Sequence, residues 1–140
     1  MKIPGPGYRL MGLTLIEVLV VMAIIAILLS LAIPSYRQYL QRGDRAEAIR
    51  TLLEMATCQE RARSDNGYYD TTRCLVTSQS DFYRFRIEPA DSTESLTYTL
   101  FASPLNRNRN DNCGELSLDQ KGTRGVSGDQ DRLKKCWGGG

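Results

Sequence analysis

The stretch GLTLIEVLVVMAIIAILLSLAIP, residues 12–34, decides the fold of this 140-residue chain. Within it, residues 18–33 contain Ser30 as their only polar side chain. Together with residues 13–17 they give about twenty residues, which at ~1.5 Å per residue span the ~30 Å hydrocarbon layer of a membrane. A helix that is apolar all round has no soluble partner to bury it. It therefore requires lipid or other copies of itself.

A carboxylate, Glu17, interrupts the apolar stretch near its start. A charge at the bilayer centre costs about 3 kcal/mol on insertion scales, and less near the edge. If the chain were cleaved between Gly12 and Leu13, the new α-amino group would lie about one helical turn from Glu17. The two groups could pair within one chain or between neighbouring chains. The alternative is a tolerated charge near the membrane interface, and we favour the functional interpretation.

The sequence GLTLIE, followed by a long apolar helix and Pro34, closely resembles the class III signal of type IV pilins and pseudopilins. In that family a short basic leader ends in glycine, a large apolar residue begins the mature chain, and glutamate is its fifth residue. Gly12, Leu13 and Glu17 occupy these places, with Leu13 in place of the usual phenylalanine. The resemblance implies cleavage after Gly12 by a prepilin peptidase, N-methylation of Leu13, and assembly roles for Glu17 and Pro34.

The resemblance also implies a domain organisation. Residues 1–12 are expected to form the cleaved leader, residues 13–35 a transmembrane or filament-core helix, and residues 36–140 a periplasmic or extracellular head. Lys2 and Arg9 favour a cytoplasmic leader. The implied location is a single pass through the inner membrane before assembly and a cell-surface pilus afterwards.

Beyond Pro34 the apolar residues recur at threes and fours, which is typical of a helix with one buried face. The predicted buried face comprises Tyr36, Tyr39, Leu40, Ala46, Ile49, Leu52, Leu53 and Ala56. The predicted polar face comprises Arg37, Gln41, Arg45, Glu47, Arg50, Glu54, Gln59 and Arg61. We therefore predict one helix over residues 14–62, kinked or loosened at Pro34 and weakened at Gly43.

The head is predicted to have an α+β fold, in which the long helix packs on an antiparallel sheet of three or four strands. Turn-forming residues 64–67 end the helix, and residues 68–79 form a loop. Three strand-like runs follow, at residues 82–87, 96–102 and 116–118. A turn follows at residues 120–122, and the glycine-rich segment 122–128 is interpreted as a loop.

The cysteines number four, Cys58, Cys74, Cys113 and Cys136, and an even count in a small exported domain indicates two disulfides. A Cys58–Cys74 bridge would tie the helix end to the next loop. A Cys113–Cys136 bridge would close a C-terminal loop and contribute ~3 kcal/mol, although counting leaves other pairings open. In the family this loop corresponds to the disulfide-bounded D-region. The tail, CGELSLDQKGTRG then KKCW, resembles that of PilE-type minor pilins.

Enzymatic and metal chemistry find little support in the sequence. The chain has no histidine and no CxxC pair, which argues against zinc and against Ser-His or Cys-His nucleophiles. Segment 122–128 lacks the P-loop lysine pattern. Asp119, Asp129 and Asp131 do not match EF-hand spacing and are interpreted as solvated loop acids. We therefore expect a protein that is not an enzyme and has no cofactor or metal.

Nucleic acid is the less favoured partner. Loss of residues 1–12 removes Lys2 and Arg9 and leaves 16 basic and 16 acidic side chains, a balance that disfavours nonspecific binding. Some pilins of the family bind DNA during uptake, however, and basic residues with aromatic neighbours Tyr83, Tyr98 and Trp137 occur late in the chain. The candidates are Arg84, Arg86, Lys121, Arg124, Lys134 and Lys135. Solvated charge is the favoured interpretation, with Trp137 packed against the sheet.

The favoured hypothesis is a structural subunit, minor in abundance, of a type IV pilus that supports assembly, twitching motility and adhesion. Its expected partners are major and minor pilins in a helical filament, the prepilin peptidase, the inner-membrane assembly machinery, and membrane lipid before assembly. The alternatives are a DNA-binding uptake pilin of a competence pilus and a type II secretion pseudopilin. A processed membrane enzyme that does not polymerise is a further alternative.

Overall fold

The computed structural model describes residues 12–76, 80–89 and 95–138, so most of the expected leader lies outside the described residues. The chain divides into two units, Met1–Gln38 and Tyr39–Gly140, which are described separately. One helix, α1 (Leu15–Asn66), runs through both. It confirms the predicted helix and continues without a break through Pro34 and Gly43.

The described part of the first unit is the apolar half of α1. The large apolar side chains between Leu13 and Ile33 are 44–79% exposed. Of the described helices, α1 is the one that is long and apolar enough to cross a membrane. The first unit therefore lacks any buried core of its own among the described residues, as expected for a segment that needs lipid or other chains.

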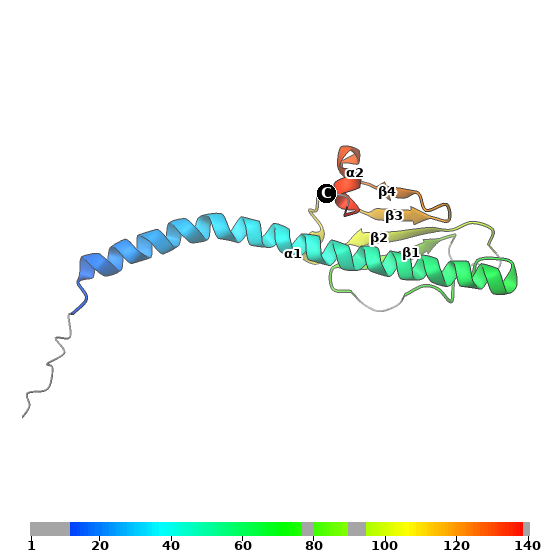
Figure 1. Ribbon diagram of the computed structural model, residues 1–140, viewed down its shortest axis with the longest axis horizontal. Coiled ribbons are helices and arrows are strands. Elements are labelled where there is room, and N and C mark those ends of the chain that lie inside the picture. Colours follow the sequence, from blue (N-terminus) through cyan, green and yellow to red (C-terminus); the bar gives the residue numbers. More distant parts are fainter. Residues whose placement is uncertain (1–11, 77–79, 90–94, 139–140) are drawn as a thin grey trace, which may run out of the picture. The chain divides into compact units, whose positions relative to one another are not determined.

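The second unit contains a four-stranded antiparallel sheet in the order β1-β2-β3-β4 (Figure 1). The strands are β1 (Tyr83–Glu88), β2 (Thr99–Pro104), β3 (Leu116–Asp119) and β4 (Arg124–Val126). The register pairs buried residues across the sheet, namely Ile87 with Leu100, Leu100 with Leu118, and Leu116 with Val126. This arrangement confirms the predicted α+β fold.

The fourth strand lies inside segment 122–128, whose interpretation as a loop was therefore wrong in part. Gly125 pairs with Ser117, and a Cβ atom built at Gly125 would lie 2.4 Å from the Ser117 Oγ atom. Glycine thus permits a close approach between the two strands here. Its presence weakens the sequence pattern of a strand, which is why a loop was predicted.

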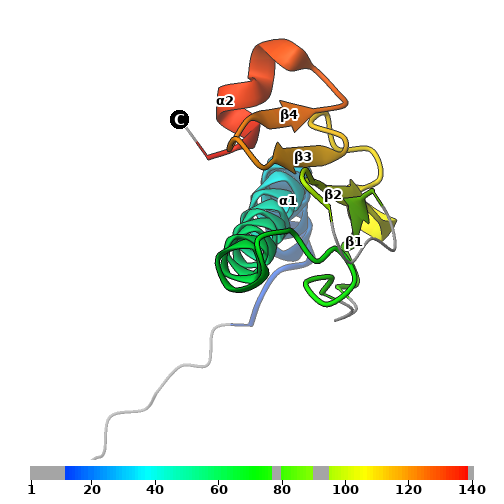
Figure 2. The same cartoon turned by 90° about the vertical axis from the view of Figure 1, so that its right-hand side faces the viewer.

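The core of the second unit forms where α1 crosses one face of the sheet (Figure 2). The helix contributes a stripe at alternating spacings of four and three, made of Ala48, Leu52, Met55, Gln59 and Ala62. The sheet contributes the buried side chains of Tyr83, Ile87, Leu100, Ala102, Leu116, Leu118 and Val126. Alternate residues of each strand thus form one apolar surface beneath the helix.

The buried face of α1 differs from the predicted one. Tyr36 and Tyr39 are 63% and 72% exposed, and Ala46 and Leu53 are exposed as well. Gln59, which was assigned to the polar face, is fully buried, because its Nε2 atom donates a hydrogen bond to the Asp70 carbonyl at 2.8 Å.

Two disulfides connect the second unit. Cys58 in α1 bonds to Cys74, and Cys113 bonds to Cys136. Cys136 ends the short helix α2 (Leu133–Cys136), which follows the 3-10 turn η2 (Gln130–Arg132). Another 3-10 turn, η1 (Asn106–Asn108), lies between β2 and β3. Neither turn nor α2 was predicted, since each is held by specific contacts rather than by a repeating pattern.

Candidate functional site

The start of α1 carries the residues that the sequence singled out for processing and assembly. The Thr14 carbonyl accepts hydrogen bonds from the Glu17 and Val18 amides, and the Glu17 amide also donates to Thr14 Oγ1 at 3.3 Å. Thr14 and Glu17 therefore have the spacing of a capping box, with a carboxylate in the first helical turn where the helix dipole favours it. The observed hydrogen bonds of Glu17 in this turn are made by its backbone amide.

The Glu17 carboxylate has no ion pair within the part of the chain that the structure describes. It is exposed, as are its apolar neighbours Ile16 (65%) and Val18 (48%). Gly12 and Leu13, the expected processing positions, precede the helix and are exposed too. These five residues at or near the expected cleavage point are thus open to another molecule.

A polar network ties residues 41–45 of α1 to the segment between β2 and β3. Arg45 donates to both carboxylate oxygens of Asp111, with the shortest contact at 2.6 Å, and the two side chains are only 12% and 4% exposed. Arg107 donates to both carboxylate oxygens of Asp44, at 2.7 and 2.8 Å. Asn108 donates to Asp44 at 3.0 Å. Arg45 had been assigned to the polar face, and its burial is explained by this bidentate partner.

Ionisation of two groups is altered by this network. Burial acts to raise the pKa of Asp44, but hydrogen bonds from Arg107 and Asn108 outweigh it and hold that pKa below its ordinary value. Burial, followed by the negative charge of Asp111, raises the pKa of Tyr83 to about 12. The Tyr83 hydroxyl is buried without a hydrogen-bond partner among the described residues. The charged form of Asp44 and the neutral form of Tyr83 are thus favoured.

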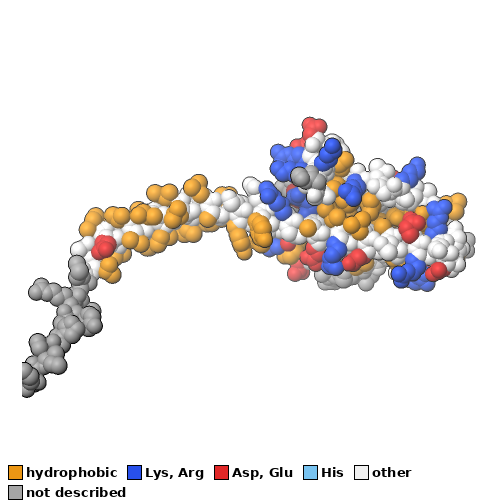
Figure 3. All heavy atoms as spheres, in the orientation of Figure 1, with side chains coloured by type: hydrophobic (Ala, Val, Ile, Leu, Met, Phe, Trp, Pro, Cys, Tyr) orange, Lys and Arg blue, Asp and Glu red, His pale blue; other side chains and the backbone are white. Residues whose placement is uncertain are grey.

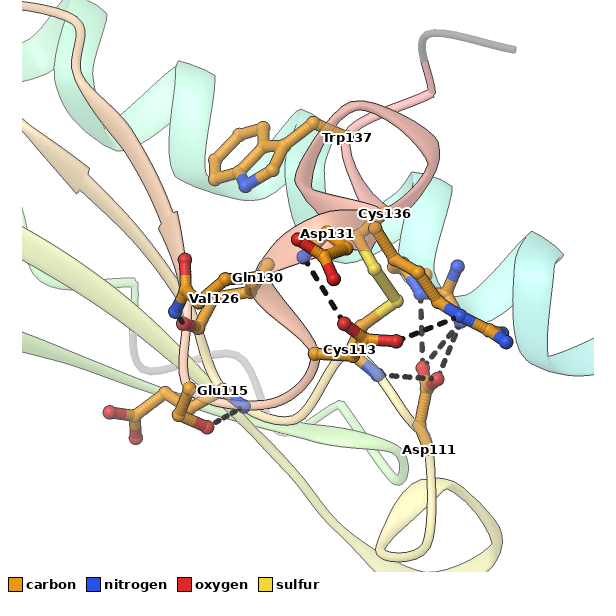
Figure 4. The surroundings of a disulfide bond; sticks show 12 residues. Asp111, Cys113, Glu115, Val126, Gln130, Asp131, Cys136 and Trp137 are labelled. Atoms are coloured by element: carbon orange, nitrogen blue, oxygen red, sulfur yellow. Dashed lines mark hydrogen bonds and ion pairs between the residues drawn. A yellow bond between two sulfur atoms is a disulfide. The ribbon is translucent and has the colours of Figure 1, made fainter.

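The C-terminal region is built around the Cys113–Cys136 bond (Figure 4). Residues 127–129 run beside the backbone around Cys113. Their amides donate hydrogen bonds, in order, to the carbonyls of Glu115, Cys113 and Asn112. A Cβ atom on Gly128 would lie 2.1 Å from the Asn112 carbonyl oxygen, so glycine is required for this approach. The Trp137 indole nitrogen donates to the Gly125 carbonyl at 3.1 Å, and Trp137 is 6% exposed. The prediction that Trp137 packs on the sheet is confirmed.

The six basic residues considered for nucleic-acid binding differ in their exposure and in their ion pairs. Arg86 is occupied, since it forms ion pairs with Glu88 and with Glu115 at 2.8 Å and lies 3.7 Å from the Phe101 ring centroid. Arg84 is exposed on β1. The others that are exposed lie in the C-terminal part of the head, at Lys121, Arg124, Lys134 and Lys135. The structure therefore does not unite all six in one site.

The predicted aromatic neighbours cannot serve as stacking platforms in this conformation. Tyr83, Tyr98 and Trp137 are 2%, 3% and 6% exposed. Tyr98 lies edge-on to Tyr69, with ring centroids 4.7 Å apart, and burial raises its pKa. Arg124 lies 5.3 Å from the Trp137 ring centroid, where it covers that ring. Binding by base stacking finds no exposed aromatic among these three residues.

The loop acids considered for calcium organise turns. Asp119 Oδ1 accepts hydrogen bonds from the Lys121 and Thr123 amides, at 2.9 and 2.7 Å. Asp129 accepts from the Asp131 amide and pairs with Arg132 at 3.0 Å. Within the described ranges no group of three or more Cys, Asp or Glu side chains is arranged to hold a metal.

Two family models match this chain. Residues 12–33 match the prokaryotic N-terminal methylation motif, and residues 34–117 match the family described as type IV minor pilin ComP, DNA uptake sequence receptor. The chain belongs to the type IV minor pilin family. The sequence-based recognition is thereby confirmed, and the pilin fold and family are those of structural subunits.

Sequence relatives of this minor pilin include both pilins and secretion proteins. It is 32% identical to type II secretion system core protein G of Pectobacterium carotovorum, over 61% of this chain and 57% of that protein. It is 38% identical to prepilin peptidase-dependent protein D of Escherichia coli K12, over 43% of this chain and 41% of that protein. The minor pilin thus spans about half the length of these relatives.

Solved structures support the fold. A type IV pilin from Shewanella oneidensis is 34% identical and superimposes with a TM-score of 0.53, covering 64% of this minor pilin and 96% of the other chain. The non-core minor pilin PilV from Neisseria meningitidis is 22% identical, with a TM-score of 0.50 and coverage of 65% and 90%. The second similarity concerns the fold alone.

Sequence reasoning missed the network around Asp44, Arg45 and Asp111 in this minor pilin. A cue did exist for Asp44, because it lies four residues after Leu40, where the spacing of the buried face predicts an apolar residue. The partners of Asp44 and Arg45 lie more than sixty residues later, and nothing in a local pattern identifies them.

Proposed function

We propose that this minor pilin is a structural subunit of a type IV pilus and that residues 13–33 are both its membrane anchor and its filament contact. The observation that carries the proposal is a continuous apolar helix surface, wholly exposed in the single chain, that begins at a prepilin motif. Such a surface is stable in lipid or when covered by equivalent helices. Residues 1–12 would be the leader, and residues 36–140 the head outside the inner membrane.

Assembly requires that an apolar helix leave the bilayer together with Glu17. In the proposed sequence of events, a prepilin peptidase cleaves after Gly12 and the Leu13 amine is methylated. The resulting ammonium group pairs with Glu17 of the same chain or of a neighbouring one, which removes the cost of an isolated charge. Pro34 lacks an amide hydrogen and locally loosens the helix backbone. No catalytic role is proposed for any residue.

Mass spectrometry of the N-terminus in the native host tests the processing step. The expected mature protein begins at Leu13 and carries a methyl group on its amine. Substitution of Gly12→Val should leave unprocessed precursor in the membrane and none in sheared filaments. A mature chain beginning at Met1 in wild-type filaments would contradict the proposal, while Gly43→Val serves as a matched control for glycine replacement elsewhere.

DNA binding is a second candidate function, since the matching family includes DNA uptake sequence receptors. Of the six basic candidates, four are exposed and have neither an ion pair nor an aromatic ring contact within the described ranges, namely Arg84, Lys121, Lys134 and Lys135. Contacts from these side chains would neutralise phosphates, and each would add to the salt dependence of binding. The balanced charge and buried aromatics weigh against it.

Duplex DNA binding by the detergent-solubilised full chain tests this second function. Binding should weaken steeply with added salt, and Lys134→Ala with Lys135→Ala should weaken it more than Arg50→Ala, which lies in an exposed helical ion pair. Absence of binding at low salt would dismiss the function without affecting the structural proposal.

A further inference from the structure

A groove of about 280 Å³ lies within the second unit, between α1 and α2. Ala46 and Ile49 of α1 and Cys136 of α2 line it with apolar atoms, and Arg42 and Lys135 line it with cations. Figure 3 shows basic side chains gathered over α2 and over the neighbouring part of α1. The groove therefore combines an apolar surface with positive charge, a combination that suits an anionic amphiphile.

Two of the three cations that line this groove, Arg42 and Lys135, form no ion pair within the described part of the head. Arg45 is paired with Asp111, but Arg42, Lys134 and Lys135 are exposed and have no ion pair within residues 12–76, 80–89 and 95–138. Asp131, on the turn before α2, contributes an opposing charge. Glu47 contributes little, because five residues of helix place it about 140° around α1 from Arg42. An excess of positive charge remains.

The position of Arg42 along the helix relates the groove to a membrane. Ile33 ends the apolar stretch, and Arg42 follows it by only nine residues in the sequence. Tyr36 and Tyr39 lie in this interval and are 63% and 72% exposed. Exposed tyrosines beyond an apolar helix are typical of the headgroup level of a bilayer. A bilayer that contains residues 13–33 therefore brings Arg42 within reach of its headgroups.

We propose that the groove formed by Arg42, Lys135 and the neighbouring Lys134 receives phosphate headgroups of anionic phospholipids before assembly. The guanidinium and ammonium groups would bind phosphate, and Ala46, Ile49 and Cys136 would contact the carbon atoms of the headgroup beyond the phosphate. The inference rests on membrane anchoring by residues 13–33. It adds a second attachment, made by the head, that must be released when the subunit enters a filament.

Photocrosslinking in nanodiscs tests the inference with the full chain. A diazirine amino acid replaces Ala46, which is exposed and lines the groove. Discs of phosphatidylcholine alone are compared with discs that also contain phosphatidylglycerol. Each basic residue that binds an anionic headgroup should make lipid adducts about fivefold more frequent in the discs with phosphatidylglycerol than in the discs without it. The number of adducts should fall when salt is added. Arg42→Ala with Lys135→Ala should reduce the adducts to the phosphatidylcholine level.

A matched control removes the same charge from a distant part of the head. Arg61→Ala with Lys121→Ala deletes two exposed cations, and Arg61 lies nineteen residues, or about 28 Å of helix, beyond Arg42. This control should retain wild-type lipid adducts. Equal adducts in both kinds of disc, or equal losses in the two double variants, would overturn the inference.

Crosslinks from the groove to molecules other than lipid would contradict the inference. Predominant crosslinks to a second copy of the chain, or to added duplex DNA while lipid adducts stay low, would assign the groove to another partner and overturn the inference. Incorporation into the discs is measured separately, by co-purification with the scaffold protein. Failure to incorporate would contradict membrane anchoring in the proposed function, and with it the inference.

Discussion

Two carboxylates of this chain, Asp111 and Glu17, differ in burial and in ion pairing. Asp111 is 4% exposed and satisfied by two hydrogen-bonding nitrogens of Arg45. Glu17 is exposed on an apolar helix and has no cationic partner in the described part of the chain. Asp111 therefore contributes to the folding of the head, whereas the proposed function assigns Glu17 a cationic partner at the processed N-terminus of its own or a neighbouring chain.

Glu17→Gln separates charge from helix capping, because glutamine also fits the last position of a capping box. We expect filament incorporation to fall about tenfold or more, which corresponds to loss of ~1.4 kcal/mol of pairing energy. The melting temperature of the head should not change. Immunoblots of sheared filaments and membranes measure the distribution, and Thr14→Ala, which weakens only the cap, should still assemble. Wild-type incorporation of Glu17→Gln would refute charge pairing.

Asp111→Asn tests the buried ion pair. It leaves the Arg45 guanidinium in a nearly closed site without its anion, and removal of one partner from a buried pair costs ~3 kcal/mol or more. Urea unfolding of the detergent-solubilised chain measures the loss. Glu54→Gln breaks the exposed Arg50–Glu54 pair instead and should cost less than about 0.5 kcal/mol. Similar losses in the two variants would show that burial of the pair is unimportant.

At the residue level, Glu17 stands out in the sequence because a carboxylate is rare in an apolar helix, and its role in assembly stays a prediction. Arg45 and Gln59 were assigned to the wrong face, because their burial depends on Asp111 and the Asp70 carbonyl, which helical periodicity does not include. A prediction that considers only the spacing of apolar residues was therefore wrong for these two polar side chains, whose partners lie elsewhere in the sequence.

Among the elements, α1 is the most predictable, since its apolar composition and its 3.6-residue period each indicate helix. Predicted residues 14–62 compare with Leu15–Asn66 in the structure. β2 begins at Thr99 rather than at residue 96, and β4 was missed because Gly125 makes it resemble a loop. The short elements depend on disulfide and backbone contacts made by other parts of the chain.

The C-terminal elements should depend on the disulfide that joins them. Cys113→Ser with Cys136→Ser opens a bridge that spans 23 residues, and we expect a loss of ~3 kcal/mol in the free energy of unfolding. Hydrogen exchange should rise in β4 and α2 and stay unchanged in residues 48–55 of α1. The double variant Cys58→Ser and Cys74→Ser is the comparison, and it should loosen the end of α1 instead. Uniform changes along the chain in both variants would contradict this assignment.

At the scale of the whole molecule, the two units have different needs. The first exposes its apolar surface, which in the proposed function is covered by lipid or neighbouring chains. The second has its own core, two disulfides and a polar network that fastens the helix to the sheet. Composition alone predicted an apolar segment followed by a polar, mixed one. It could not foresee the groove between α1 and α2, which depends on tertiary placement of the C-terminal turn.

The pH dependence of head stability should show a broad plateau, since the chain has no histidine. The pKa values of Asp44, Asp70 and Asp119 are lowered in the folded state, so the unfolded chain binds more protons in acid and stability falls as pH drops below about 4. The pKa of Tyr83 is raised to about 12 in the folded state, whereas in the unfolded chain it is about 10. The unfolded chain therefore loses the tyrosine proton at lower pH than the folded one, and the stability of the head falls between pH 10 and about 12.

Thermal melts by circular dichroism across this range measure the profile. Tyr83→Phe is the matched variant, because it deletes a hydroxyl that has no hydrogen-bond partner among the described residues. Its melting temperature should match wild type near pH 7 and decline less above pH 10. A marked transition between pH 5 and 8 would be inconsistent with the expected set of titrating groups.

Trp137 gives the head a built-in optical reporter. It is the only tryptophan of the chain, it is buried, and it follows the disulfide cysteine Cys136 directly. Indole emission shifts to longer wavelength when the ring meets water, so the colour of the emitted light should follow the docking of the last residues onto β4. Loosening of this C-terminal corner during extraction, reduction or polymerisation could then be followed in real time without attaching a dye.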